Sequence, residues 1–545
     1  MTAPDKVRRE AGVIGLLYAS LGSIIGSGWL FGALNASMQA GPFSMASWTI
    51  GATAVLFLAF VFAELSTMFP NSGALVHMVH VSHGDMLGKI WSWVLFLAFV
   101  SVPPVEVIAV LTYMNTLLPQ SGFLGMGHFL DASGLLTPIG TASSLVLLAL
   151  VVALNFMAIR WVIAINSVTT WWKVLVPVVT IFILMAYSFH PENMTAQLQS
   201  TPTSGIFTAV GTAGIIFSFL GFQQAIALAG ETRNPGKYVP IALIGSVVIA
   251  LIIYLGLQYA FIVALDPNDI SSGWPQLHFA GMFGPLAAIL TAVGALWWAS
   301  VLYFDAVVSP LGTAFIYITG SPRILMAAGE MGGAPSHVAK LNRWGVPWIA
   351  LIATYIFGAA FFFPFPSWSK LVSAVSSITV LSYAIGPVIL LHLRKILPGA
   401  ERPFRLKGSA AVSMIAFIAS NWIIYWTGNY VMSVLFVLVG GYVAFLLVWH
   451  LLVKRLPASS LGWQHAWWLL PYFAGMWLIS FFGPSASGMG GNDTFGFFTG
   501  MLLVTLFSPA MLWLALKTGV TSAAAQAHSD KVGAMGSRGM EMPLH

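Results

Sequence analysis

Long apolar runs recur along the whole of this 545-residue chain. An α-helix needs roughly 17–25 apolar residues to cross a bilayer, and only helices and closed barrels satisfy their backbone groups in lipid. The alternation of an outer-membrane barrel does not occur in these runs, which favours helices. We therefore predict an all-α polytopic membrane protein of about fourteen helices. The runs lie at about 12–37, 43–69, 90–118, 138–158, 162–187, 204–230, 239–264, 283–318, 346–363, 370–393, 409–427, 430–453, 463–482 and 495–516.

The composition supports a membrane protein in contact with lipids. Hydrophobic residues make up 58% of the chain and charged residues 7%, against about 25% charged in an average globular protein. The net charge of +6 is modest and reflects loop charges rather than a nucleic-acid surface, so we expect no nucleic-acid partner. Cysteine is absent from the sequence, which excludes disulfides and thiolate metal sites.

The basic residues predict the orientation of the helices. If the N-terminus is cytoplasmic, 20 of the 22 Lys and Arg residues fall on the inner side, with Lys370 at an outer edge and Lys173 inside the membrane. The predicted outer loops 189–203, 265–282 and 483–494 contain no Lys or Arg. This asymmetry follows the positive-inside rule. It predicts a multi-pass protein of the cytoplasmic (inner) membrane with both termini in the cytoplasm.

Two helices contain glycine-rich interruptions at corresponding places. Residues 22–28 read GSIIGSG, and residues 217–224 read FSFLGFQQ after three further glycines at 205, 211 and 214. Glycines also allow helices to pack closely, which is the ordinary explanation for any one of them. The two interruptions lie five helices apart, so the interrupted helices cross in opposite directions. This favours a 5+5 inverted repeat with a substrate site between two unwound segments, as in secondary transporters.

The predicted organisation has five parts. A cytoplasmic N-terminus (1–11) precedes the first repeat of helices 1–5 (12–188) and the second repeat of helices 6–10 (204–393). Accessory helices 11–14 (409–517) and a disordered cytoplasmic tail (518–545) follow.

Four stretches resemble the amino acid–polyamine–organocation (APC) superfamily of transporters. They are GSIIGSGWLFG (22–32), AELSTMFPNSGA (63–74), FSFLGFQQAIALAGETRNPGKYVPIAL (217–243) and SPRILMAAGEMGGAPSHVAKLNRWGVPWIAL (321–351). The resemblance implies a LeuT-like fold for helices 1–10 and transport of an amino acid or a derived amine. Within this superfamily, the chain most resembles the acidic amino acid–proton symporter branch. The resemblance rests on the motif GSGWLFG and on the two helices beyond the usual twelve.

The resemblance also implies a substrate site at the two interruptions. Backbone N–H groups at a half-helix N-terminus suit the substrate carboxylate, and carbonyls at a C-terminal end suit its amine. The residues implied for the carboxylate are Ser23, Ile24, Ser27 and Gly28. The residues implied for the amine are Phe217, Ser218 and Leu220. Gln223 departs from many relatives, which carry an acid there, so that acid cannot take part in coupling in this chain.

Lys173 lies within the run 162–187, which is otherwise free of charge. A charged side chain at membrane depth costs about 2.5–3.5 kcal/mol on insertion scales and marks a functional site by default. The resemblance places it where proton-coupled relatives carry a lysine in helix 5. It could load and release a proton during transport, or it could be a permanently charged strut on the carbonyls of helix 1.

Two carboxylates also lie inside predicted helices. Asp305 shares a helix face with Ser309 and Thr313, and Glu106 follows two prolines in helix 3. Each could couple protons or serve as a hydrogen-bonded interior partner. Glu64 and Glu231, at the inner ends of helices 2 and 6, are expected to anchor gates or loops by pairing with Arg or Lys.

No metal site and no cofactor other than the coupling proton are expected. His77, His80 and His83 recur every three residues and share a helix face, which could ligate a metal. No carboxylate partner is clearly placed beside them, so an amphipathic gate segment is the favoured interpretation.

The sequence therefore predicts a secondary active transporter, not an enzyme, that imports an amino acid by proton symport with alternating access. An amino acid/amine antiporter is the main alternative, and a polytopic membrane enzyme or a channel is disfavoured because no HExxH, GxSxG or filter motif occurs. The amino acid could be acidic, small neutral or apolar. The protein could be a monomer or a homodimer.

Overall fold

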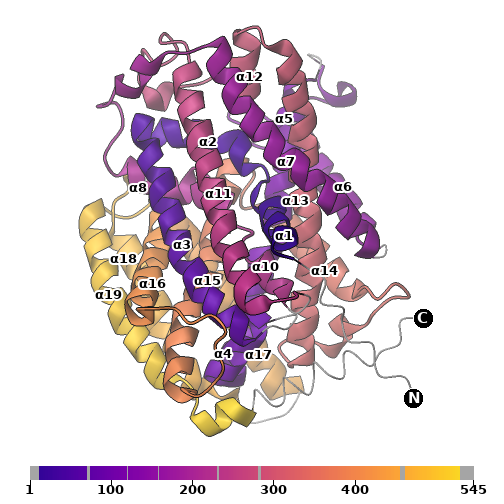
Figure 1. The fold of residues 1–545 in the computed structure, drawn as a ribbon, viewed down its shortest axis with the longest axis vertical. Coiled ribbons are helices and arrows are strands. Elements are labelled where there is room, and N and C mark those ends of the chain that lie inside the picture. Colours follow the sequence, from indigo (N-terminus) through magenta and orange to yellow (C-terminus); the bar gives the residue numbers. More distant parts are fainter. Residues whose placement is uncertain are drawn as a thin grey trace.

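The computed structural model describes residues 12–69, 74–118, 121–156, 159–229, 232–279, 284–453 and 461–527, without the side chains of 74, 159–169, 453 and 487. Each of the fourteen predicted runs contains at least one helix, which confirms the all-α prediction over this part of the chain (Figure 1). Glu231, the segment 1–11 and the tail beyond residue 527 lie outside the described residues. The α-helices are α1 (Val13–Ile24), α2 (Gly28–Ala40), α3 (Ser44–Met68), α4 (Ala74–Val100), α5 (Val102–Thr116), α6 (Pro138–Leu154), α7 (Ile159–Tyr187), α8 (Gly205–Thr212), α9 (Ile215–Phe219), α10 (Gln224–Ala227), α11 (Pro235–Ala264), α12 (Pro285–Ala292), α13 (Leu296–Glu330), α14 (Trp348–Ala360), α15 (Trp368–Ile396), α16 (Ser409–Trp426), α17 (Asn429–Val448), α18 (Leu469–Phe482) and α19 (Phe497–Thr518).

Many of these helices are long and apolar enough to span a membrane. Among the described residues, nine helical stretches meet that test, and a tenth does so if the pair 205–212 and 215–227, bent by 54°, is one span. Four shorter apolar helices, α1, α6, α14 and α18, accompany them. The protein is therefore an integral multi-pass membrane protein.

The predicted helix 8 (283–318) has the wrong boundaries. The structure contains a short helix, α12, and then the long helix α13, which begins at Leu296 and continues to Glu330. Gly294 between them has a φ of +83°, which a glycine adopts without strain and which stops α12. The apolar sequence is continuous across this break, so hydropathy alone could not locate it.

Helices five positions apart in the predicted order pack against each other. Helix α2 contacts α9, α3 contacts α11, α5 contacts α13, and α6 contacts α14. These are helices 1 and 6, 2 and 7, 3 and 8, and 4 and 9 of the prediction. These four contacts are compatible with two repeats related by an axis in the membrane plane.

Both predicted interruptions are confirmed as breaks. Helix α1 ends at Ile24 and α2 begins at Gly28, while α9 ends at Phe219 and α10 begins at Gln224. Gly221 has a φ of +118°, a conformation that side-chain-bearing residues rarely adopt. A further break at Gly214, φ +90°, separates α8 from α9.

The accessory helices cover one flank of the bundle. Figure 1 shows α18 and α19 at the edge opposite α6 and α7. Helix α19 packs on α16 and α15, and α16 packs on α3 and α15. The predicted disordered tail differs from the structure at its start: residues 522–527 are helical, and Val520 and Ala525 are buried.

Candidate functional site

The two broken helices face each other at their breaks. A Cβ atom added to Gly28 would collide with Ser218 Oγ, and one added to Gly221 would lie 2.6 Å from the Ser23 carbonyl carbon. All four residues are buried. At Gly28 and Gly221, a side chain would collide with the facing broken helix, so glycine is required. This close approach explains the glycines at the two breaks.

Gly28→Ala is expected to reduce transport about tenfold or more, because overpacking costs about 1–3 kcal/mol and 1.4 kcal/mol corresponds to a factor of ten. Initial uptake rates in proteoliposomes measure the effect. The control is Gly440→Ala, since a Cβ at that helical position meets no atom within 4 Å. Equal uptake by the two variants would contradict the close approach.

Lys173 joins three helices at the break between α1 and α2, which we call the break of helix 1. Its Nζ donates hydrogen bonds to the Gly22 carbonyl in α1 and to Thr313 Oγ1 in α13, both at 2.8 Å. The lysine itself belongs to α7 and is fully buried. The predicted position beside helix 1 is confirmed, and the geometry is compatible with both a strut and a proton carrier.

Glu106 of α5 occupies the break of helix 1. Its Oε2 accepts the Ser27 backbone N–H at 2.8 Å. Its Oε1 is buried and has no hydrogen-bond partner within the described part of the chain. One of the amides expected to receive the substrate carboxylate is thus already bound by a carboxylate of the protein.

Asp305 is the second carboxylate at this junction. It is buried in α13, accepts the Ser309 hydroxyl at 2.6 Å, and interacts electrostatically with Lys173. The Trp172 side chain interacts with the same carboxylate. Lys173, Glu106 and Asp305 carry a net charge of −1 when all three are ionised, so one added proton neutralises the group.

The other predicted substrate residues lie at the breaks, but some of their groups are engaged. The Ile24 carbonyl accepts from Tyr254 at 3.3 Å, and the Phe217 carbonyl accepts the Leu220 N–H at 3.1 Å. The Ser218 hydroxyl donates to the Gly214 carbonyl. Their role in substrate binding stays a prediction.

Trp368 covers the site from the first turn of α15, and the sequence did not single it out. Its indole N–H donates to Ser27 Oγ at 2.9 Å. Its ring lies 4.7 Å from the Phe31 ring and 6.1 Å from the Phe217 ring. This aromatic group links α2, α9 and α15 across the breaks.

A neutral polar group lies at the break between α9 and α10, which we call the break of helix 6. It consists of Gln223, Tyr317 and Tyr383. Gln223 Oε1 accepts the Gly221 N–H at 3.0 Å, which points its amide nitrogen at the Tyr317 hydroxyl, 3.4 Å away. The Tyr383 ring packs on Phe222, and its buried hydroxyl interacts with the Gln223 side chain. Tyrosines in apolar runs give no sequence signal for such a site.

Comparison with known proteins agrees with this architecture. The family model described as "Amino acid permease" matches residues 12–479. The chain belongs to the amino acid permease family. This places it in the APC superfamily, as the sequence motifs indicate, and makes it an amino acid transporter.

Two long relatives come from Bacillus subtilis (strain 168). One, named "Glutamate/serine transporter AimA", is 35% identical over 94% of this chain and 95% of its own length. The other, named "Aspartate-proton symporter", is 31% identical over 96% of this chain and 99% of its own length. The "L-asparagine permease" of Escherichia coli (strain K12) is 25% identical over 73% of this chain and 79% of its own length.

Glu64 anchors the C-terminal half of α3 to α15. Its carboxylate accepts hydrogen bonds from Arg394 Nε at 2.9 Å and from the Leu406 N–H at 2.7 Å, and it lies 3.3 Å from Arg402 Nε. The predicted pairing with arginine is confirmed. The contact joins α3 to α15 and to the segment that follows α15.

Glu64→Ala is expected to lower thermal stability sharply. Removing one member of a buried ion pair costs about 3–5 kcal/mol because the remaining charge loses its partner. Thermal unfolding of the purified permease measures the change, and Glu192→Ala, which removes an exposed carboxylate, is the control. Equal melting temperatures would show that the anchor contributes nothing.

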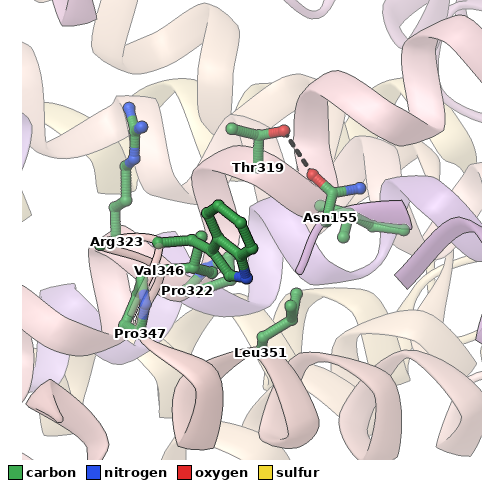
Figure 2. Close-up of a pocket in the computed structure, with 10 residues that line it drawn as sticks. Asn155, Thr319, Pro322, Arg323, Val346, Pro347 and Leu351 are labelled. Atoms are coloured by element: carbon green, nitrogen blue, oxygen red, sulfur yellow. Dashed lines mark hydrogen bonds between the residues drawn. The ribbon is translucent and has the colours of Figure 1, made fainter. Parts of the chain in front are cut away.

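Two cavities in the described part of the chain lie away from the breaks. One of about 80 Å³ lies between α13 and the segment before α14, and Figure 2 shows the Thr319–Asn155 hydrogen bond on one side of it and Arg323 on the other. A hollow of about 780 Å³ is lined mainly by residues 264–279 and α12. The described residues contain no cluster of three metal-ligating side chains; among the predicted histidines, His80 lies 3.5 Å from Asp85.

Proposed function

We propose that this permease imports an amino acid together with a proton by alternating access, across the cytoplasmic membrane and with both termini inside. The observation that carries the proposal is the buried group of Lys173, Glu106 and Asp305 beside the break of helix 1. With one cation and two carboxylates, this buried group can bind one proton and release it again without a rearrangement of the helices. The name of the aspartate–proton symporter supports the same coupling ion.

Substrate and proton binding are linked through Ser27. The substrate α-carboxylate and the Glu106 carboxylate compete for the same backbone N–H. When substrate takes that N–H, Glu106 loses a hydrogen bond that favours its ionised form, and protonation of Glu106 becomes easier. Substrate therefore promotes proton binding, and by reciprocity a proton promotes substrate binding.

The side chain of the substrate is expected to meet Gln223, Tyr317 and Tyr383. These residues offer an amide N–H and phenolic O–H groups, because the Gln223 oxygen is occupied by Gly221. Buried donors without a carboxylate among them suit an oxygen acceptor and disfavour a cationic side chain. We therefore propose an acidic amino acid as substrate, in line with the names of the two Bacillus relatives.

Tyr383→Phe is expected to raise the KM for glutamate and aspartate about 10–100-fold, since a hydrogen bond to a charged group contributes about 1.5–3 kcal/mol. The KM for serine stays unchanged. Tyr442→Phe, which removes a buried hydroxyl bonded to the Gly333 carbonyl, is the matched control and affects neither substrate class. A uniform change across substrates for Tyr383→Phe would instead indicate a general gate.

Flux into proteoliposomes without internal amino acid tests the transport mode. A proton gradient alone is expected to drive uphill uptake of labelled glutamate. An antiporter would require internal counter-substrate, a channel would not accumulate substrate, and an enzyme would not deliver it unchanged. Uptake that depends on internal amino acid would overturn symport.

A further inference from the structure

Three histidines from three separate elements bind the end of α19. His83 Nε2 of α4 lies 3.1 Å from the Ala515 carbonyl, and His392 Nε2 of α15 lies 3.0 Å from the Val520 carbonyl. His465 Nδ1 lies 2.6 Å from the Thr518 carbonyl. Each imidazole thus donates one N–H to a carbonyl at the end of α19 or just beyond it, and the Ala515 carbonyl also accepts the Thr518 hydroxyl at 2.8 Å.

The chain after α19 continues the contact, and we call residues 519–527 the C-terminal strap. The Val520 N–H donates to the Ser82 carbonyl at 3.1 Å. A Cβ at Gly519 would collide with the His392 ring, and Val520 is only 4% exposed. The strap is therefore seated in a fitted cradle formed by α4 and α15.

The cradle is connected to the Glu64 anchor. His392 lies two residues before Arg394, which binds Glu64 of α3. The strap, α4, α15 and α3 thus form one continuous set of contacts at the side where the basic residues predict the cytoplasm. Release of the strap would therefore remove the His392–Val520 contact from α15.

We propose that the C-terminal strap is a latch that cytoplasmic acidification opens. The His83 and His392 ring centroids are 5.0 Å apart, so charging both creates repulsion in a buried place. The His392 ring also interacts with the Leu516 carbonyl, so it faces the end of α19 as well as the strap. Neutral imidazoles hold the strap, and protonated ones release it.

The surrounding charges act in the same direction. Lys395 on α15 and His465 repel a positive charge on His392, whereas the Val520 and Leu516 carbonyls attract it. Lys517 on α19 is stacked on Trp513 at 4.0 Å, and Asp85 on α4 lies beside His80. The latch is thus closed at neutral pH and loses stability as the pH falls.

An introduced thiol tests the latch without measuring transport. The sequence contains no cysteine, so Val520→Cys gives the full-length permease a single thiol at a buried position. Its maleimide labelling rate in detergent, divided by that of the exposed Ser522→Cys, is expected to rise about tenfold between about pH 7.5 and about pH 5.5, across the titration range of histidine. An unchanged ratio would overturn the proposal.

Replacing the histidines identifies the sensor. In a Val520→Cys background, His83→Gln with His392→Gln keeps amide donors for the carbonyls but cannot titrate, so the ratio is expected to be independent of pH. The milder His392→Gln alone serves if the double variant does not fold. His190→Gln, distant in an exposed loop, is the control and retains the full response. A full response in the His392 variant would contradict the assignment.

Discussion

Lys173→Met is expected to abolish proton-driven accumulation of substrate. A gradient of about 2 pH units stores about 2.7 kcal/mol per proton, enough for about 100-fold accumulation with one proton per substrate. The variant removes the ammonium that binds Gly22 and Thr313 and leaves Glu106 and Asp305 without their cation. The inside-to-outside ratio in proteoliposomes should therefore fall to about 1.

The control for this experiment is Lys370→Met, which removes an exposed lysine at the start of α15. It should accumulate substrate like the unmodified permease. Because Lys173→Met leaves two buried carboxylates unpaired, its melting temperature should also fall. Undiminished accumulation by Lys173→Met would exclude a role for this lysine in coupling.

Glu106→Gln is expected to separate substrate movement from proton movement. The glutamine oxygen can still accept the Ser27 N–H, so the break of helix 1 keeps its hydrogen bond. The side chain can no longer carry a proton, and accumulation driven by the same gradient should fall from about 100-fold to about 1. Exchange of labelled for unlabelled substrate at equal pH should continue.

This combination of lost accumulation and retained exchange distinguishes coupling from damage to the fold. Glu192→Gln, in an exposed loop, should leave both properties unchanged. If Glu106→Gln still accumulates substrate about 100-fold, the proton is carried elsewhere, and Asp305→Asn becomes the decisive variant. Loss of exchange as well would assign Glu106 to substrate binding rather than to coupling.

The breaks and the buried lysine could be predicted from the sequence because each violates a local rule. Glycines such as Gly26 and Gly28 interrupt a run that otherwise reads as a continuous helix, and a charge such as Lys173 is costly in an apolar segment. The break at Gly214 and the start of α13 were missed because the residues around them remain apolar. Hydropathy shows whether a segment can cross a membrane, but it does not show where the backbone of that segment turns.

The sequence by itself determined that this chain spans a membrane, which runs contain helices and that the runs at 22–28 and 217–224 are broken, because hydrophobic length and glycine content act locally. Only the tertiary structure decided that Glu106 binds Ser27, that Gln223 binds the Tyr317 hydroxyl, and that His392 binds the Val520 carbonyl. These contacts join residues from 79 to 128 positions apart in the sequence. They exist because paired helices bring distant side chains into a medium without water, where each polar group must find its partner within the protein.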